Sequence, residues 1–465
     1  MTRADIIQAA FKVWGRDYYR TTSLSEVARD LGVSKTALYR HFRGKQALLE
    51  AMYEWFRDDY TAQLGEGFSR IAAAADLGDA LYTLVQVVMR YYARNDNLFI
   101  FSLAYLFMEQ RRGDSGEFPL KRKPNGQIVN EVRRLAPSPE ATQFILTTLT
   151  FSMIHFHRHR RSRRAGAAGA EFTETELEAE LEAEPKAELK AELADAEIER
   201  EISLVCCIIF QGLGFSKSEI DVLDYGLLEA KVSGINRDIE ENTLLRCVAE
   251  AVAGAGPWGV SMEMVARVSG LSKSGLYAHF TNKQDMLLQL FVTEFSRIID
   301  FAEESMKLSE DPAERLYLAI FAICDYLRSR PDVLIAMDWL WIQRTGVSEP
   351  GEQKVPSRFF RIFRDLRCSP ELERRFSGLE DDWIPAWALF LIVAFLMQGI
   401  RADSKRFGEC MPKGSGWKFS REEFAKLSNE SFRNLYRIIT LGIGDPTWRS
   451  ASGIVENWGT EQVRR

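Results

Sequence analysis

Two short segments of the chain place hydroxyl groups and cations on one face of a predicted helix. In the first segment these side chains are Ser34, Lys35, Thr36, Tyr39 and Arg40. Hydroxyl, ammonium and guanidinium groups donate hydrogen bonds to phosphate oxygens and base edges, and the major groove of duplex DNA is wide enough to admit a helix. The segment therefore predicts a helix that binds double-stranded DNA.

The residues around this face predict a helix, a tight turn and a second helix. Ser23 and Glu26 fit a capping box that begins the first helix. Gly32 can adopt the positive φ that ends it, and Ser34 can cap the helix that follows. The apolar side chains expected to pack between the two helices are Leu24, Val27, Ala28 and Leu31 of the first and Leu38 and Phe42 of the second. This packing would turn the polar face outward, and Lys45 would begin a third helix whose N-terminal N–H groups attract anions.

The same pattern occurs twice in the chain. VSKTALYRHFRGKQALL at 33–49 recurs as LSKSGLYAHFTNKQDMLL at 271–288, an offset of 238 residues. Residues 80–99 pair with 315–334 at an offset of 235, and a weaker echo pairs 132–140 with 363–371. Because the three pairs follow the same order, we interpret the chain as one unit of roughly 230 residues written twice.

The apolar periodicity predicts an all-α fold. Apolar residues recur at i, i+3 and i+4, and no run alternates strictly between turns. Each copy is expected to begin with a three-helix head and to continue into a larger helical domain. The expected bounds are 1–50 and 51–235 for the first copy, 236–290 and 291–450 for the second, and 451–465 for a tail.

A charged insertion at about 158–200 interrupts the first larger domain. Residues 158–164 carry five arginines, and residues 171–201 carry thirteen Asp or Glu against three Lys or Arg. The net charge of −6 for the whole chain therefore averages over opposite blocks. We interpret the insertion as a solvated, partly helical spacer broken at Pro185. The alternative is an acidic arm that folds onto the arginines or competes with DNA phosphate.

Several other motifs predict no separate site. The six cysteines lack C-x-x-C spacing and the chain opens without a secretory leader, which indicates a reduced, cytoplasmic protein with no structural metal or cofactor. Metalloprotease, hydrolase and P-loop motifs are absent from the sequence, so we do not expect an enzyme. GAGPWG at 254–259 fits a glycine pattern of nucleotide-binding sites but has no preceding strand, so we expect no nucleotide site there. His155, His157 and His159 are interpreted as an exposed helix end, with a metal site as the alternative. Residues 383–400 are interpreted as a buried interface helix, with a membrane span as the alternative.

The two segments resemble the DNA-binding domain of the tetracycline-repressor (TetR) family. The family pattern is a capped helix, then A-x-x-x-G-V-S, then T-L-Y-x-H-F-x-x-K. The first copy matches it with Ala28, Gly32, Val33, Ser34, Thr36, Leu38, Tyr39, His41, Phe42 and Lys45. The second copy matches it with Ala266, Gly270, Leu271, Ser272, Ser274, Leu276, Tyr277, His279, Phe280 and Lys283. The resemblance covers roughly 50 residues per copy, and the remainder fits the family only in length and helix pattern.

The resemblance implies which side chains contact DNA. In the first copy the predicted set is Ser34, Lys35, Thr36, Tyr39, Arg40, His41 and Lys45. In the second copy it is Ser272, Lys273, Ser274, Tyr277, His279 and Lys283. The tyrosines, histidines and the last lysine of each copy would contact phosphates, and the first lysine and the hydroxyl beside it would face the bases. A packing role is the alternative for Tyr39 and Tyr277.

The resemblance also implies how the molecule would act. Family members are usually homodimers that read two half-sites, so one chain with two heads is expected to form an intramolecular pseudo-dimer. The alternative is ordinary dimerisation of two chains, which would carry four heads. The expected interface helices are 139–157 and 196–212 in the first copy, and 381–402 and 420–442 in the second. The larger domains would be regulatory, and we predict a repressor released by a small-molecule effector. The aromatic stretches 99–107 and 337–341 would line the effector cavity or belong to ordinary core.

The two heads differ in charge. Residues 1–50 hold nine Lys or Arg and five Asp or Glu, a balance of +4, whereas residues 239–288 hold four and five, a balance of −1. Arg40 is replaced by Ala278, and Arg43 by Thr281. The first head is therefore expected to dominate DNA affinity. The alternative function is a helical interaction or membrane-associated regulator whose second head no longer reads DNA.

Overall fold

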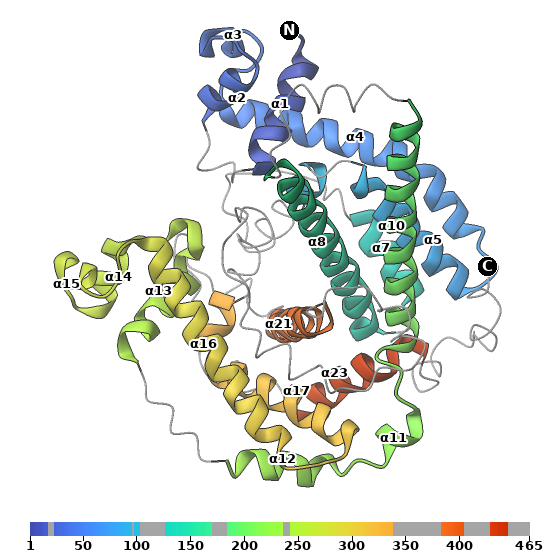
Figure 1. The fold of residues 1–465 in the computed structure, drawn as a ribbon, viewed down its shortest axis with the longest axis vertical. Helices are drawn as coiled ribbons and strands as arrows, with labels where there is room; N and C mark the ends of the chain where they lie inside the picture. The colour runs from blue at the N-terminus through green and yellow to red at the C-terminus, as the bar shows by residue number, and fades with distance from the viewer. Residues whose placement is uncertain are drawn as a thin grey trace. The chain divides into compact units, whose positions relative to one another are not determined.

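In this computed structural model the described residues are 1–16, 23–94, 97–102, 126–136, 138–169, 184–235, 242–337, 383–403 and 428–444. Every regular element in these ranges is a helix (Figure 1), which confirms the expected all-α class. The chain divides into two compact units after Cys207. Residues 208–235 therefore pack within the second unit, although they precede the second head in the sequence.

The first unit contains the first head and the helices that follow it. Its helices are α1 (Arg3–Arg16), α2 (Leu24–Asp30), α3 (Lys35–Tyr39), α4 (Lys45–Ala72), α5 (Leu77–Ala93), α7 (Gly126–Leu135), α8 (Pro139–Gly169) and α10 (Glu184–Gln211), whose last turn lies past the division. Residues 97–102 are also helical. The remainder of the predicted aromatic stretch 99–107 lies outside the described residues.

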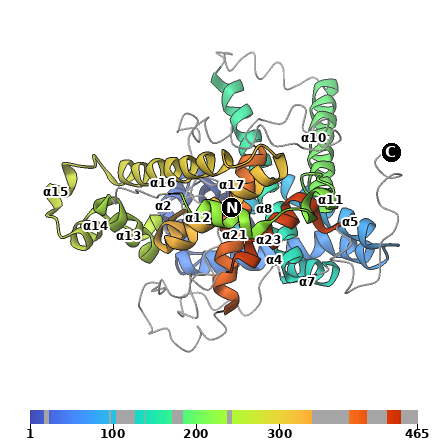
Figure 2. The same cartoon turned by 90° about the horizontal axis from the view of Figure 1, so that it is seen from below.

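The second unit repeats this order after two short helices. Its helices are α11 (Lys217–Asp221), α12 (Tyr225–Ser233), α13 (Thr243–Gly259), α14 (Met262–Ser269), α15 (Lys273–Tyr277), α16 (Lys283–Met306), α17 (Pro312–Ser329), α21 (Trp383–Asp403) and α23 (Asn429–Leu441), followed by the 3₁₀ turn η2 (Gly442–Gly444). Helices α16 and α17 lie side by side in both views (Figures 1 and 2), as α4 and α5 pack in the first unit. Helices α13–α17 thus correspond to α1–α5.

Each long helix that leaves a head is joined to the next helix by a tyrosine–carboxylate hydrogen bond. Tyr91 of α5 donates to Asp59 of α4 at 2.9 Å, and Tyr326 of α17 donates to Glu294 of α16 at 2.7 Å. The two bonds are related by an offset of 235 residues, whereas the heads are related by 238. The stretch from the first residue of the helix to the carboxylate is therefore three residues, about one turn, shorter in α16 (Lys283 to Glu294) than in α4 (Lys45 to Asp59).

The charged insertion is more helical than the sequence indicated. Helix α8 continues through the arginine block to Gly169, in keeping with the high helix propensity of arginine and alanine. Pro185 lies in the first turn of α10 and does not break it, because a first-turn proline gives up no intrahelical hydrogen bond. Residues 170–183, which include part of the predicted acidic arm, lie outside the described residues.

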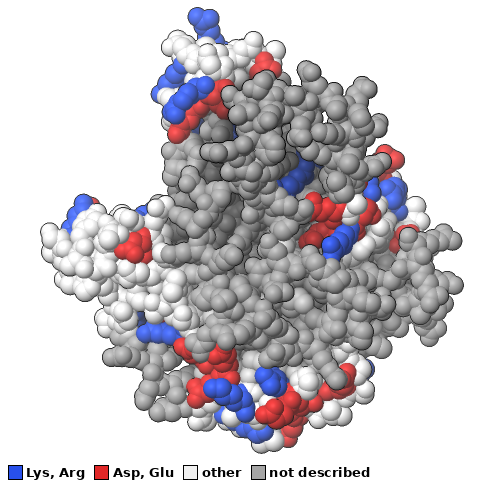
Figure 3. Space-filling model, viewed as in Figure 1, with Lys and Arg blue, Asp and Glu red and all other residues white. Residues whose placement is uncertain are grey.

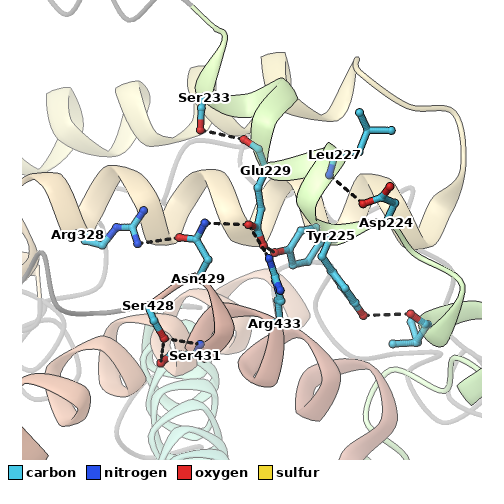
Figure 4. A network of polar contacts seen from close by, with 12 residues as sticks. Asp224, Tyr225, Leu227, Glu229, Ser233, Arg328, Ser428, Asn429, Ser431 and Arg433 are labelled. Carbon is cyan, nitrogen blue, oxygen red and sulfur yellow. Dashed lines mark hydrogen bonds and ion pairs between the residues drawn. The ribbon is translucent and has the colours of Figure 1, made fainter.

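The segment between the two copies is docked on the second unit. Glu229 of α12 is buried and accepts hydrogen bonds from Asn429 and Arg433 of α23 (Figure 4). It also accepts one from Tyr317 of α17. Further back, the N–H of Leu213 donates to the carbonyl of Ile439 at 2.8 Å. The connection from residue 212 to α12 therefore forms part of the core of the second unit.

Helix α21 is the most apolar helix of the second unit. Its described side chains, residues 383–397, are mostly buried, and the rings of Trp383 and Trp387 stack at 6.1 Å. In the described part of the chain, no helix combines the length and hydropathy that a membrane crossing requires. Its expected partner helix at 420–442 is described only from residue 428, where α23 follows.

Candidate nucleic-acid interface

The first head folds locally as its sequence pattern predicts. Ser23 and Glu26 form the capping box of α2. The N–H of Ser23 donates a hydrogen bond to the carboxylate of Glu26, and this bond lowers the pKa of Glu26. Gly32 takes a φ of 65° in the turn. The hydroxyl of Ser34 then accepts a hydrogen bond from the N–H of Ala37 at 3.3 Å and begins α3. The short helix that carries the polar face is thus fixed at its N-terminus by its own side chain.

Burial divides α3 and its flanks into a core side and an exposed side. Leu38 and Phe42 are 0% and 3% exposed, and Leu24, Val27 and Ala28 of α2 are also buried, as predicted. The exposed side carries Ser34, Lys35, Thr36, Tyr39 and Arg40, and His41 and Lys45 are half-buried. The structure therefore brings all seven predicted residues of this head onto or next to one accessible surface.

The second head repeats this arrangement. Gly270 takes a φ of 70°, Ser272 caps α15 through the N–H of Gly275 at 3.0 Å, and Leu276 and Phe280 are buried. The predicted residues Ser272, Lys273, Ser274, Tyr277 and His279 are exposed, and Lys283 is half-buried. Tyr39 and Tyr277 are each 47% exposed, so neither ring is a core side chain.

Aromatic rings hold the cations of the first head. Lys45 Nζ lies 5.9 Å from the ring centroid of the buried Trp14 of α1, and Lys35 Nζ lies 5.9 Å from that of Tyr39. Such contacts favour a cation while leaving its outer side open to an anion. At the position of Trp14, the 238-residue offset places Val252. The ring that lies beneath Lys45 in the first head is therefore replaced by an aliphatic side chain in the second.

The sequence prediction missed Arg3. Its guanidinium lies 4.8 Å from the ring centroid of Phe42, next to the end of α3, and the residue is exposed. The 238-residue offset, had it been extended to the start of the chain, would have paired Arg3 with Glu241. The second head thus lacks the positive charges of Arg40 and Arg43 and has a negative charge in place of Arg3.

The sequence prediction also missed Asp285, which lies at the N-terminus of α16. Its carboxylate accepts hydrogen bonds from the Thr281 N–H at 2.7 Å and hydroxyl at 3.1 Å, and from Gln289 at 3.0 Å. The bonds from Gln289 and Thr281 lower the pKa of Asp285, so the group is ionised at neutral pH. In the first head the matching residue is Ala47, and the first turn of α4 holds no acid. A carboxylate therefore lies at the end of the helix where a phosphate would bind.

The environment of the second lysine also differs. Desolvation lowers the pKa of Lys283, which makes its ammonium form less favoured than that of a fully solvated lysine. On the face drawn in Figure 3, the first head at the top carries several blue side chains with red ones beside them, whereas the second head at the left is mostly white. The two heads therefore share a fold and differ in electrostatics.

Other candidate sites gain no support from the described residues. His157 is buried and stacks on Phe99 at 4.6 Å, so it does not lie at an exposed helix end. No group of three or more potential metal ligands occurs in the described part of the chain. Residues 254–259 form the end of α13 rather than a loop after a strand.

Comparison with solved structures finds several bacterial regulators. The fatty acid degradation regulator FadR from Bacillus halodurans is 13% identical, with a TM-score of 0.30 over 44% of this chain and 97% of that one. FadR from Bacillus subtilis, solved in complex with stearoyl-CoA, is 15% identical, with a TM-score of 0.27 over 42% and 96%. The TetR-family regulator PfmR from Thermus thermophilus is 17% identical, with a TM-score of 0.24 over 42% and 96%.

The family model described as bacterial regulatory proteins, tetR family, matches the chain twice. The matched residues are 6–52 and 248–290, which contain the two helix-turn-helix segments α2–α3 and α14–α15. The assignment rests on these two matches and on the exposed polar helix that each contains. The chain therefore carries the DNA-binding domain of the TetR family of bacterial regulatory proteins twice.

Proposed function

We propose that the protein is a transcriptional repressor whose two heads bind one DNA site and whose helical domains respond to a small molecule. The observation that supports it most directly is the repeated exposed face of α3 and α15, with hydroxyls and cations outward and leucine and phenylalanine inward. The face contains the groups that donate to phosphates and base edges. In this proposal the two DNA-binding heads are residues 1–50 and 236–290.

The proposed contacts follow the two heads. Tyr39, His41 and Lys45 bind phosphates in the first head, and Lys35 and Thr36 face the bases or the backbone beside them. Arg3 adds a further phosphate contact, because its guanidinium is exposed beside the end of α3. The corresponding contacts of the second head are made by Ser272, Lys273, Ser274, Tyr277, His279 and Lys283.

The first head supplies most of the affinity in this proposal. It has Arg3, Arg40 and Arg43 where the second has Glu241, Ala278 and Thr281, and it has no counterpart of Asp285. Each phosphate neutralised contributes about 0.9 to the slope of log affinity against log salt, so the second head binds with a smaller slope. Because the helices differ (KTALYR against KSGLYA), the DNA site is an imperfect palindrome.

Gel shifts with separate Lys45→Ala and Lys283→Ala variants test the unequal heads. The DNA is a fragment selected from a random pool with the wild-type protein. The first change is expected to weaken binding more than the second, and equal losses would contradict the proposal. Failure of the wild-type protein to select any DNA would contradict a DNA-binding function altogether.

A second candidate function is favoured by Asp285. If its carboxylate prevents phosphate binding, the second head is a helical module that no longer reads DNA, and the first head acts as one half of an ordinary homodimer. Light scattering separates the two arrangements. A particle of one chain, 53.1 kDa, bound to both half-sites supports the intramolecular pseudo-dimer, whereas a stable particle of twice that mass supports homodimers.

A further inference from the structure

The core of the first unit contains a buried hydroxyl that has no hydrogen-bond partner among the described residues. Tyr60 of α4 is 1% exposed, and within the described part of the chain its hydroxyl has no hydrogen-bond partner. Its neighbours are paired, since Tyr91 donates to Asp59 and Tyr92 bonds to Ser102 at 2.9 Å. A hydroxyl removed from water without a partner costs free energy, and unpaired groups of this kind are uncommon in native cores.

The second unit shows what the fold requires at this position. Tyr91 and Asp59 correspond to Tyr326 and Glu294 at an offset of 235 residues. At the same offset, Phe295 of α16 corresponds to Tyr60. Phe295 is 0% exposed and stacks on Phe291 at 5.2 Å. An aromatic ring alone therefore fills this position between the two helices. The hydroxyl of Tyr60 is an addition confined to the first unit.

Tyr60 belongs to a continuous line of aromatic rings that runs through α4, α5, the helical residues 97–102 and α8; the three numbered helices are labelled in Figure 1. Neighbouring ring centroids are 5.5 Å apart for Tyr60 and Tyr91, 5.0 Å for Tyr91 and Tyr92, 5.4 Å for Tyr92 and Phe99, and 4.6 Å for Phe99 and His157. In the other direction the line continues through Phe56 and Phe101 to Phe11 of α1. The same line of rings therefore reaches the first helix of the head.

Buried polar groups on the late helix also distinguish the first unit. Helix α8 carries Ser152 and His157, which are 0% and 3% exposed. The described side chains of α21, its predicted counterpart, are all apolar from residue 383 to residue 397. The Ser152 hydroxyl donates to Glu201 of α10 at 2.6 Å. The core around the late helix of the first unit thus contains polar side chains, whereas the described side chains of α21 include none.

We propose that the first unit, and not the second, binds the effector, and that the effector is an uncharged aromatic molecule whose acceptor oxygen takes the hydrogen bond of the Tyr60 hydroxyl. The aromatic rings of the line contact its flat body. The charged group bonded to these tyrosines is the carboxylate of Asp59, which repels an anion and so favours a neutral ligand. The inference rests on the proposed effector response and assigns it to one unit.

Acetophenone is a suitable probe, because it is a neutral aromatic ketone, and α-methylstyrene has the same shape with a methylene in place of the oxygen. Acetophenone is expected to raise the melting temperature of the wild-type protein in a concentration-dependent manner. Tyr60→Phe should weaken its binding about tenfold, the value of one hydrogen bond, and leave the binding of α-methylstyrene unchanged. Phe295→Tyr, which places the same hydroxyl in the second unit, is the matched control and should not change the binding of acetophenone.

The melting temperature without any probe tests the starting observation. Tyr60→Phe should leave it unchanged or raise it, because the hydroxyl has no partner to lose. A lower melting temperature would show that the hydroxyl is already paired in the free protein and would overturn the inference, as would equal acetophenone binding by wild type and Tyr60→Phe, or no binding at all. A gel shift without acetophenone separates failure of this inference from failure of the proposed DNA-binding function. If the protein binds DNA but acetophenone has no effect, this inference is rejected and the DNA-binding function is retained.

Discussion

Glu229 of α12 accepts two hydrogen bonds from the guanidinium of Arg433 of α23, at 2.7 Å from Nε and 2.9 Å from Nη2. Tyr317 donates to the same carboxylate at 2.6 Å and Asn429 at 2.8 Å. Three helices that are far apart in the sequence meet at this one group (Figure 4). The segment that joins the two copies is thus fixed to the second unit by a buried, fully bonded charge.

Replacing this carboxylate should destabilise the second unit. Glu229→Gln keeps the shape of the side chain but removes the charge that Arg433 faces, and we expect the free energy of unfolding to fall by about 2–4 kcal/mol. Urea unfolding measures this change. Glu310→Gln is the control, because the side chain of Glu310 is 98% exposed, and it should leave the midpoint almost unchanged. Similar midpoints for the two variants would show that the buried network adds little.

The same carboxylate should make stability fall in acid. Burial acts to raise the pKa of Glu229, but the hydrogen bonds from Arg433, Tyr317 and Asn429 outweigh it, and the pKa lies below its ordinary value of 4.5. A lowered pKa in the folded state stabilises the protein above the ordinary value, and this stabilisation is lost as the pH falls through the lower, folded-state pKa. Melting temperatures measured from neutral pH to below pH 4.5 should therefore fall more steeply for wild type than for Glu229→Gln. Parallel curves would argue against this assignment.

The end of α10 crosses the end of α23 at two glycines, and this contact should not accept a side chain. A Cβ added at Gly212, where φ is +56°, would lie 2.5 Å from the carbonyl oxygen of Ile439 and 2.6 Å from the N of Gly442. Gly212→Ala should cost more than about 2 kcal/mol, since the positive φ and the clash add. Gly254→Ala is the control, because it is in a helix with open space around it, and alanine there should stabilise by roughly 0.5–1 kcal/mol. Thermal unfolding of both variants checks the difference.

The heads were predictable because their information is local. The capping serines, the glycine of the turn and the leucine and phenylalanine of the core lie within about twenty residues of one another. Each of them takes the local role that the spacing predicted. The exposed faces around Tyr39 and Tyr277 follow directly from that packing. The repeat itself was also visible, because the same spacings recur in the same order.

The contacts between distant helices were not predictable. Glu229 looks like an ordinary surface glutamate in its own segment, and nothing near it signals that Arg433, more than two hundred residues later, will face it. The correspondence between Asp59 and Glu294 in the repeat was hidden, because α16 is three residues shorter than α4 and the offset therefore changes from 238 to 235 between the head and the carboxylate. Asp285 was visible as a charge, but its effect depends on where the end of α16 lies relative to the reading helix.

Arg3 should contribute to DNA binding through one phosphate. Arg3→Ala is expected to reduce the slope of log affinity against log salt by about 0.9 while leaving the selected DNA sequence unchanged. Lys12→Ala is the comparison in the same helix, because Lys12 pairs with Asp30 of α2 at 2.9 Å, and it should change the slope less. Binding measured by fluorescence anisotropy over a range of salt concentrations decides between them, and equal slopes for Arg3→Ala and wild type would remove Arg3 from the interface.

An exchange of charge between the heads should show why they differ. Asp285→Asn retains an acceptor for Thr281 but removes the negative charge at the start of α16, so DNA affinity should rise by a factor of about three to ten, which corresponds to ~1 kcal/mol of surface electrostatics. Ala47→Asp places the acid at the matching position of α4 and should lower affinity by at least as much, because the first head supplies more of the binding. Gel shifts on one DNA fragment measure both. If Asp285→Asn leaves affinity unchanged while Ala47→Asp lowers it, the second head does not contact phosphate, and the single-headed alternative gains support.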